Sequence, residues 1–113
     1  IAPDQRIYKK SGISNQNQSV KPITYSVIKS GLIGMSKYFA TYFDGRIRSN
    51  ALCPGGVENG QDEEFLKRLK NLIPSGRLAK VNEYRGTIIY MLSDASTYMN
   101  GAIISVDGGR TAW

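Results

Sequence analysis

The fold of this 113-residue chain is indicated most clearly by one segment, Tyr25-Ser26-Val27-Ile28-Lys29-Ser30-Gly31. The segment begins a series of apolar residues three or four apart: Tyr25, Ile28, Leu32, Met35, Phe39 and Tyr42. That spacing predicts a helix from Thr24 to about Phe43 with one apolar face. The Thr24 hydroxyl is a suitable N-cap, and Asp44-Gly45 supplies a stop.

Beyond this helix the chain alternates short apolar segments with further helical patterns. Strands are predicted from Ile47 to Leu52, before Cys53-Pro54-Gly55-Gly56, and from Ala102 to Val106, before Asp107-Gly108-Gly109. Helices are predicted from Gly60 to about Ile73, and from an Asn82 cap to about Leu92 with Tyr84, Ile88, Met91 and Leu92 facing inward. Apolar strands that alternate with helices indicate an α/β fold with a parallel sheet covered by helices.

The chain is expected to be one partial domain over residues 1–113. Residues 1–23 are polar and carry little periodicity, so they are interpreted as a surface loop or insertion. Two strands cannot bury the apolar faces of these helices alone. The opening Ile-Ala-Pro-Asp lacks Met and a charged leader before an apolar run, so we interpret the chain as a fragment.

Composition excludes several functional classes. The net charge of +6 is spread along the chain rather than clustered, so nucleic-acid binding is not expected. The apolar stretches are too short for a membrane span. Histidine is absent and Cys53 is the single cysteine, so neither a Cys/His metal site nor an internal disulfide is expected. A reducing cytoplasm is the expected location.

Tyr25 and Lys29 carry the candidate chemistry. They lie four residues apart at a helix start, which places both side chains on one face. A phenol titrates near ~10, and a nearby ammonium favours the phenolate. Such a tyrosine can act as a general acid toward a carbonyl or as a base toward an alcohol. Taken alone, the pair is more often a core aromatic residue beside a solvated amine.

Further motifs follow the pair in a fixed order. They are Arg46-Ile-Arg-Ser-Asn50-Ala-Leu-Cys-Pro54-Gly55-Gly56-Val57, Pro74-Ser-Gly-Arg77-Leu, Glu83-Tyr, Leu92-Ser93-Asp94, and Asn100-Gly101-Ala-Ile-Ile-Ser-Val-Asp107-Gly108-Gly109. From Thr24 to Gly109 this set resembles the second half of a short-chain dehydrogenase/reductase. The resemblance implies the C-terminal portion of a Rossmann-like, doubly wound parallel sheet, whose N-terminal cofactor-binding half lies outside this chain.

The resemblance also implies a role for each matching residue. Tyr25 would be the catalytic acid or base, and Lys29 would hold the nicotinamide ribose hydroxyls of NAD or NADP and favour ionisation of Tyr25. The turn Pro54-Gly55-Gly56-Val57 would lie against the cofactor, with the Val57 backbone at the nicotinamide carboxamide. A plain strand-terminating turn is the alternative for that segment.

Two positions depart from the family pattern. Asn59 stands where the family has threonine; it can supply similar hydrogen bonds to the cofactor or cap a helix. The catalytic serine is usually thirteen residues before the tyrosine, and that position is Gly12. Ser11 and Ser14 are neighbours, but we interpret residues 4–22 as an insertion and expect the serine before Ile1. The glycine-rich phosphate loop and the catalytic asparagine are also absent.

The implied activity is NAD(P)-dependent interconversion of a secondary alcohol and a ketone. The opening and closing segments resemble members from bacterial surface-glycan or flagellin-modification pathways, which implies a sugar or nucleotide-sugar substrate. The costly helical glycines Gly31 and Gly34 suggest close packing on a helix that in this family helps form the interface of a homodimer or tetramer. The alternatives are an inactive fragment that acts only as an association module, and a sugar epimerase or dehydratase of the extended branch.

Overall fold

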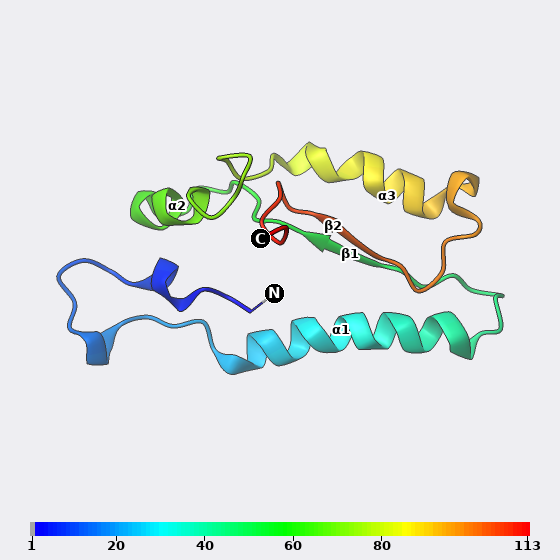
Figure 1. The fold of residues 1–113 in the computed structure, drawn as a ribbon, viewed down its shortest axis with the longest axis horizontal. Coiled ribbons are helices and arrows are strands. Elements are labelled where there is room, and N and C mark those ends of the chain that lie inside the picture. Colours follow the sequence, from blue (N-terminus) through cyan, green and yellow to red (C-terminus); the bar gives the residue numbers. More distant parts are fainter. Residues whose placement is uncertain (1) are drawn as a thin grey trace.

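The structure is a computed structural model that describes residues 2–113. Two parallel strands, β1 (Ala51–Pro54) and β2 (Ile103–Val106), pair with Ala51 opposite Ile103 and Pro54 opposite Val106. Helix α1 (Ile23–Tyr42) lies on one side of them and α3 (Arg85–Leu92) on the other, while α2 (Glu63–Lys70) lies beyond their carboxyl ends (Figure 1). The predicted α/β fold, a parallel sheet between helices, is confirmed.

Helix α1 has nearly the predicted bounds but not the predicted cap or buried face. Pro22 is the N-cap, so Thr24 lies inside the first turn and caps nothing. The predicted stop is confirmed, since Asp44 and Gly45 have φ of 50° and 77°, a backbone turn that ends a helix.

The face of α1 that approaches the sheet is lined by small residues and a few larger ones. Ser36 is 8% exposed, and its neighbours on this face are Ser26, Ile33, Phe39, Ala40 and Phe43. Of the predicted stripe, Ile28 is 61% exposed and Tyr42 is 60% exposed. The prediction of one apolar face failed because the helix is apolar on several sides, and the side covered within this chain is the one that carries Ser36.

The other elements are shorter than predicted or shifted. Strand β1 begins four residues after the predicted Ile47 and extends to Pro54. Helix α2 begins after Asp62, whose carboxylate accepts from the Phe65 N–H, because this side chain satisfies a free amide that Gly60 cannot.

The segment before α3 is a 3-10 helix, Val81–Tyr84, so Asn82 is not a cap. Of the residues predicted to face inward from this region, Tyr84 is buried at 8% exposure. Ile88 and Leu92 are exposed at 44% and 79%, so the inward orientation is wrong for them in this chain.

Two side-chain amides hold the amino ends of the strands together, and one of them, Asn100, also bonds to α1. Asn50 donates to the Met99 carbonyl at 3.0 Å and accepts from the Ala102 N–H at 2.9 Å. Asn100 donates to the Ala40 carbonyl at 2.7 Å and accepts from the Ser49 N–H at 2.9 Å. These motif residues therefore hold the scaffold together at the end opposite the candidate site.

Residues 2–22 form the predicted surface loop, with two short 3-10 helices, Gln5–Tyr8 and Asn15–Asn17. The loop lies beside α2 (Figure 1) and buries Ile7 at 8% exposure. No helix in the described chain is long and apolar enough to cross a membrane. Residues 2–113 also hold no group of three or more metal-binding side chains.

Candidate active site

A cleft of about 730 Å³ lies between α1 and β1 and extends past the carboxyl ends of the two strands. Its walls come from α1, from the turn after β1, and from the loop of residues 2–22. Five residues predicted from the sequence line it together: Tyr25, Lys29, Pro54, Gly55 and Gly56. The structure therefore joins the helical pair to the turn that follows β1, as a site between them requires.

Tyr25 lies between two lysines in this cleft. The Lys29 Nζ is 5.9 Å from the centroid of the Tyr25 ring, and the Lys21 Nζ is 4.4 Å from it. Both distances are within the range of cation–π attraction. Because Tyr25 is 41% exposed, a ligand in the cleft can reach its ring and hydroxyl.

The end of the cleft is shaped by a close approach of the two strands at Gly55. A Cβ added at Gly55 would lie 2.8 Å from the Cα of Asp107, closer than real Cβ contacts allow. The Tyr84 hydroxyl donates to the Gly55 carbonyl at 3.0 Å and so fixes the turn from the side of α3. Burial raises the pKa of Tyr84, with further contributions from Glu83 and Asp107.

Asp107 closes the end of β2 by hydrogen bonding within its own turn. Its carboxylate accepts from the Thr111 hydroxyl at 2.6 Å and from the N–H groups of Gly109 and Thr111. The hydroxyl of Thr111 is the main cause that lowers the pKa of Asp107. The carboxylate is therefore ionised and already fully engaged beside the cleft.

The remaining two predicted cofactor residues do not line the cleft. Val57 pairs with Ala79 in a parallel bridge, and its carbonyl accepts from the Gln61 amide at 2.6 Å. The Asn59 N–H donates to the Gln61 side chain at 2.8 Å. Asn59 is not a helix cap, since Asp62 takes that position at α2.

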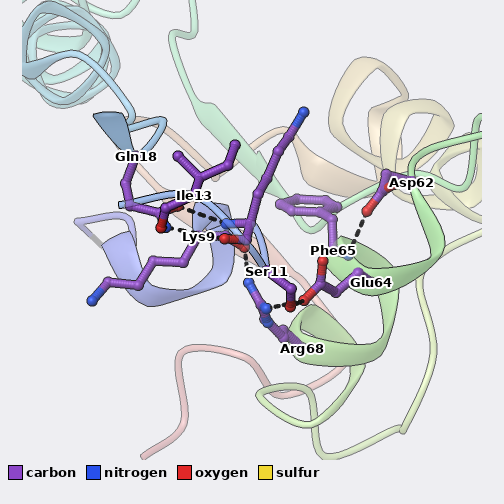
Figure 2. Close-up of polar contacts among 9 residues, drawn as sticks. Lys9, Ser11, Ile13, Gln18, Asp62, Glu64, Phe65 and Arg68 are labelled. Carbon is purple, nitrogen blue, oxygen red and sulfur yellow. Dashed lines mark hydrogen bonds and ion pairs between the residues drawn. The ribbon is translucent and has the colours of Figure 1, made fainter. Parts of the chain in front are cut away.

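The serines near the expected catalytic position are directed elsewhere. The Ser11 hydroxyl donates to Glu64 of α2 at 2.6 Å, and neither Ser11 nor Ser14 lines the cleft. Figure 2 shows this contact in a cluster that ties the loop to α2: Arg68 pairs with Glu64 and donates to the Lys9 carbonyl. The loop therefore supplies a wall of the cleft, while Ser11 and Ser14 lie outside it.

That wall holds residues that the sequence pattern did not single out. Tyr8 packs on Phe65 of α2, with ring centroids 5.6 Å apart, and both line the cleft. Burial raises the pKa of Tyr8, and so does the nearby Tyr25. Lys21 lies four residues before Tyr25 but outside α1, ahead of its Pro22 cap, so the helical spacing that relates Tyr25 to Lys29 does not apply to it.

Comparison with known proteins gives concordant matches along nearly the whole chain. The family model described as enoyl-(acyl carrier protein) reductase matches residues 7–111. The NADP-dependent mannitol dehydrogenase of Hypocrea jecorina is 33% identical over 99 residues, covering 84% of this chain and 37% of that enzyme. The chain thus spans well under half the length of this curated relative.

Two solved structures share the fold. A short chain dehydrogenase from Leptospira borgpetersenii with bound NAD+ matches with a TM-score of 0.83 and 30% identity, over 96% of this chain and 39% of that one. A gluconate 5-dehydrogenase from Burkholderia cenocepacia, in complex with NADP and tartrate, matches with a TM-score of 0.75 and 29% identity, over 91% and 42%. On its motifs, its fold and these matches, the chain belongs to the short-chain dehydrogenase/reductase family.

Proposed function

We propose that this chain is the catalytic part of an NAD(P)-dependent oxidoreductase that interconverts a secondary alcohol and a ketone. The observation that carries the proposal is the position of Tyr25 beside Lys29 in the cleft at the strand ends. Open parallel sheets bind ligands at this edge. The family membership and the nucleotide-bound relatives support the same activity.

The residues present fit a nicotinamide cofactor. Gly55 and Gly56 line the cleft with backbone alone, while the sides where a Cβ would stand are packed against Asp107 and Leu78. The Val57 N–H and the Lys29 ammonium donate to no acceptor within residues 2–113, so both are available to a ligand. Lys29 would hold the ribose hydroxyls, and the family resemblance would place Val57 and Asn59, which lie outside the cleft, at the carboxamide. When bound, the cofactor supplies or accepts a hydride at the substrate carbon.

The proton would move through Tyr25. Its hydroxyl would donate to the oxygen of a ketone, or accept from an alcohol, while Lys29 keeps positive charge beside the phenol. Charge that develops on the phenol oxygen would be stabilised by this ammonium. The assignment of Tyr25 as the acid or base follows from its accessibility in the cleft and from its matching position in the family.

We infer a sugar-derived substrate. Relatives named for mannitol and gluconate act on polyhydroxylated chains, which supports a sugar or nucleotide-sugar here, as does the resemblance to surface-glycan and flagellin-modification members.

Homodimer or tetramer formation through α1 is part of the proposal, because several apolar side chains of this helix are exposed. Sedimentation of the full-length protein tests this, and a monomer would contradict it. Cytoplasmic location is inferred from the single Cys53.

The experiment is a substrate panel with the full-length protein. Formation of NADH or NADPH is followed with polyols, sugars, sugar acids and nucleotide-sugars beside simple alcohols and steroids. We expect turnover of a sugar-derived alcohol with one of the two nucleotides. A protein that associates but reduces neither nucleotide with any member would favour the inactive association module. Epimerisation or dehydration without net nucleotide reduction would favour the extended branch.

A further inference from the structure

The charged groups of the cleft are not balanced. Its two carboxylates are already engaged: Arg6 forms an ion pair with Asp4 at 2.6 Å, and Asp107 is held within its own turn. Three cations also line the cleft, Lys21, Lys29 and Arg110. None of their side chains has a hydrogen-bonded acceptor or ion-pair partner in the part of the chain that the structure describes. The cleft therefore offers positive charge to a ligand.

Of these three cations, Lys21 is the one that neighbouring residues hold most firmly in place. Its ammonium lies 4.4 Å from the Tyr25 ring centroid and 5.9 Å from that of Tyr8, so two aromatic rings flank it. Its backbone is held on both sides by Gln5, whose amide accepts from the Lys21 N–H at 2.9 Å and donates to the Lys21 carbonyl at 3.1 Å. Lys21 is thus fixed beside Tyr25.

The surroundings make an anionic partner favourable. Lys21 is half-buried, and Ile7 and Phe65 stand on the same wall of the cleft. A partly buried cation loses hydration, and the two rings replace only part of it. The first turn of α1 adds the positive end of a helix next to this ammonium, since Pro22 provides no side-chain cap. A carboxylate or phosphate placed here would restore the balance of charge.

The two lysines differ in their position relative to α1: Lys29 lies on the helix, and Lys21 lies before its Pro22 cap. Lys29 follows Tyr25 by one helical turn and is the residue proposed for the cofactor ribose, whereas Lys21 precedes Tyr25 and adjoins the loop wall. We propose that Lys21 is a specificity residue that binds a carboxylate or phosphate of the substrate beside Tyr25, so that the cleft selects an anionic substrate. This inference rests on the proposed oxidoreductase function and narrows its substrate class.

The test is ligand binding by the full-length protein saturated with its nicotinamide nucleotide, measured by isothermal titration. D-gluconate is compared with D-glucitol, and D-glucose 1-phosphate with methyl α-D-glucoside, so that carboxylate and phosphate sources are distinguished. In at least one pair the anion is expected to bind about tenfold more tightly than its neutral match, since hydrogen bonds to charged groups give differences of that order. Equal affinity within both pairs, or no binding at all, would overturn the proposal.

Substitutions at Lys21 test whether this residue causes the preference for an anionic ligand. Lys21→Met keeps the apolar stem and removes the charge, so it is expected to abolish the preference, while Lys21→Arg retains most of it. Lys37→Met is the control, because Lys37 is an exposed lysine of α1, the helix that follows Lys21, and does not line the cleft. The proposal fails if Lys21→Met leaves the preference intact, or if it weakens nucleotide binding instead. Oxidoreductase activity is measured separately with the substrate panel. A failure of the Lys21 proposal can therefore be distinguished from a failure of the proposed oxidoreductase function.

Discussion

Gly55 shows how a single residue shapes the site. The strands end here against each other, and the turn passes so near Asp107 that a methyl group has no space. The carbonyl of Gly55 is also held by Tyr84 from the far side. A shift of this turn would therefore move the wall of the cleft that faces Tyr25.

Gly55→Ala is expected to destabilise the protein by about 1–3 kcal/mol, because the new Cβ meets backbone rather than a flexible side chain. Gly86→Ala is the control, since Gly86 is an exposed helical position with no atom within 4 Å of the added carbon. That change should stabilise the protein by about 0.5–1 kcal/mol. Urea unfolding of the full-length protein measures both. Equal effects of the two substitutions would contradict this account of Gly55.

At the same scale, the sequence was informative about the proposed catalytic pair, which the structure places together in the cleft, and less so about its surroundings. Tyr25 and Lys29 are found because a spacing of four on a helix is a local property. Tyr8 and Phe65 meet through a contact across 57 positions, which no local pattern encodes. Gly31 and Gly34 were expected to mark close helix packing, yet no atom within this chain comes within 4 Å of their added Cβ positions.

At the scale of elements, the link between the turn at Arg77 and the 3-10 helix Val81–Tyr84 depends on one carboxylate. Arg77 holds Glu83 through two hydrogen bonds of 2.7 Å, and Glu83 also accepts from the Lys80 N–H at 2.7 Å. These donors, the Arg77 guanidinium first, hold the pKa of Glu83 at about 2. An unfolded glutamate titrates near ~4.3.

Because the folded pKa is the lower one, the stabilisation from Glu83 is present above pH ~4.3 and is lost as the pH falls toward 2. Glu83→Gln is expected to lower stability at pH 7 and to reduce the loss between pH ~4.3 and 2. Asp4, with a pKa of about 2 beside Arg6, also contributes to the loss of stability in this pH range. That contribution remains in the Glu83→Gln variant. Urea midpoints across this range measure the effect, with Glu58→Gln as control, since the Glu58 carboxylate has no hydrogen-bond partner in the described chain. An unchanged pH dependence in Glu83→Gln would refute the link.

Whether a segment is a helix or a strand was easier to predict from the sequence than the residues at which it begins and ends. The long helix and the second strand were found almost to the residue, since hydrophobic periodicity is strong there. The caps at Thr24 and Asn82 were wrong because α1 begins earlier, after Pro22, and because Asn82 lies inside a 3-10 helix that leads into α3. The first strand was placed too early because Ile47 is apolar but 51% exposed, in the turn before the sheet.

At the scale of the whole molecule, the chain measures 55 × 27 × 24 Å and buries few apolar side chains: Ile7, Ile73, Leu78 and Tyr84. It covers 39% of the NAD+-bound relative from Leptospira borgpetersenii. We expect the remainder of the full-length protein, with a second copy, to cover the exposed faces of α1 and complete the cofactor site. We propose that the cleft around Tyr25 is the part of that site that this chain supplies.

The proton-transfer role of Tyr25 is tested most directly by Tyr25→Phe in the full-length protein, with the substrate identified by the panel. The change removes one oxygen and keeps the ring between the two lysines. Turnover should fall by about 10²–10⁴-fold, the usual contribution of general acid–base catalysis, while nucleotide affinity changes less than about twofold. Tyr38→Phe, an exposed tyrosine on the same helix, should change neither. Turnover by Tyr25→Phe within a few fold of the unmodified protein would contradict the assignment.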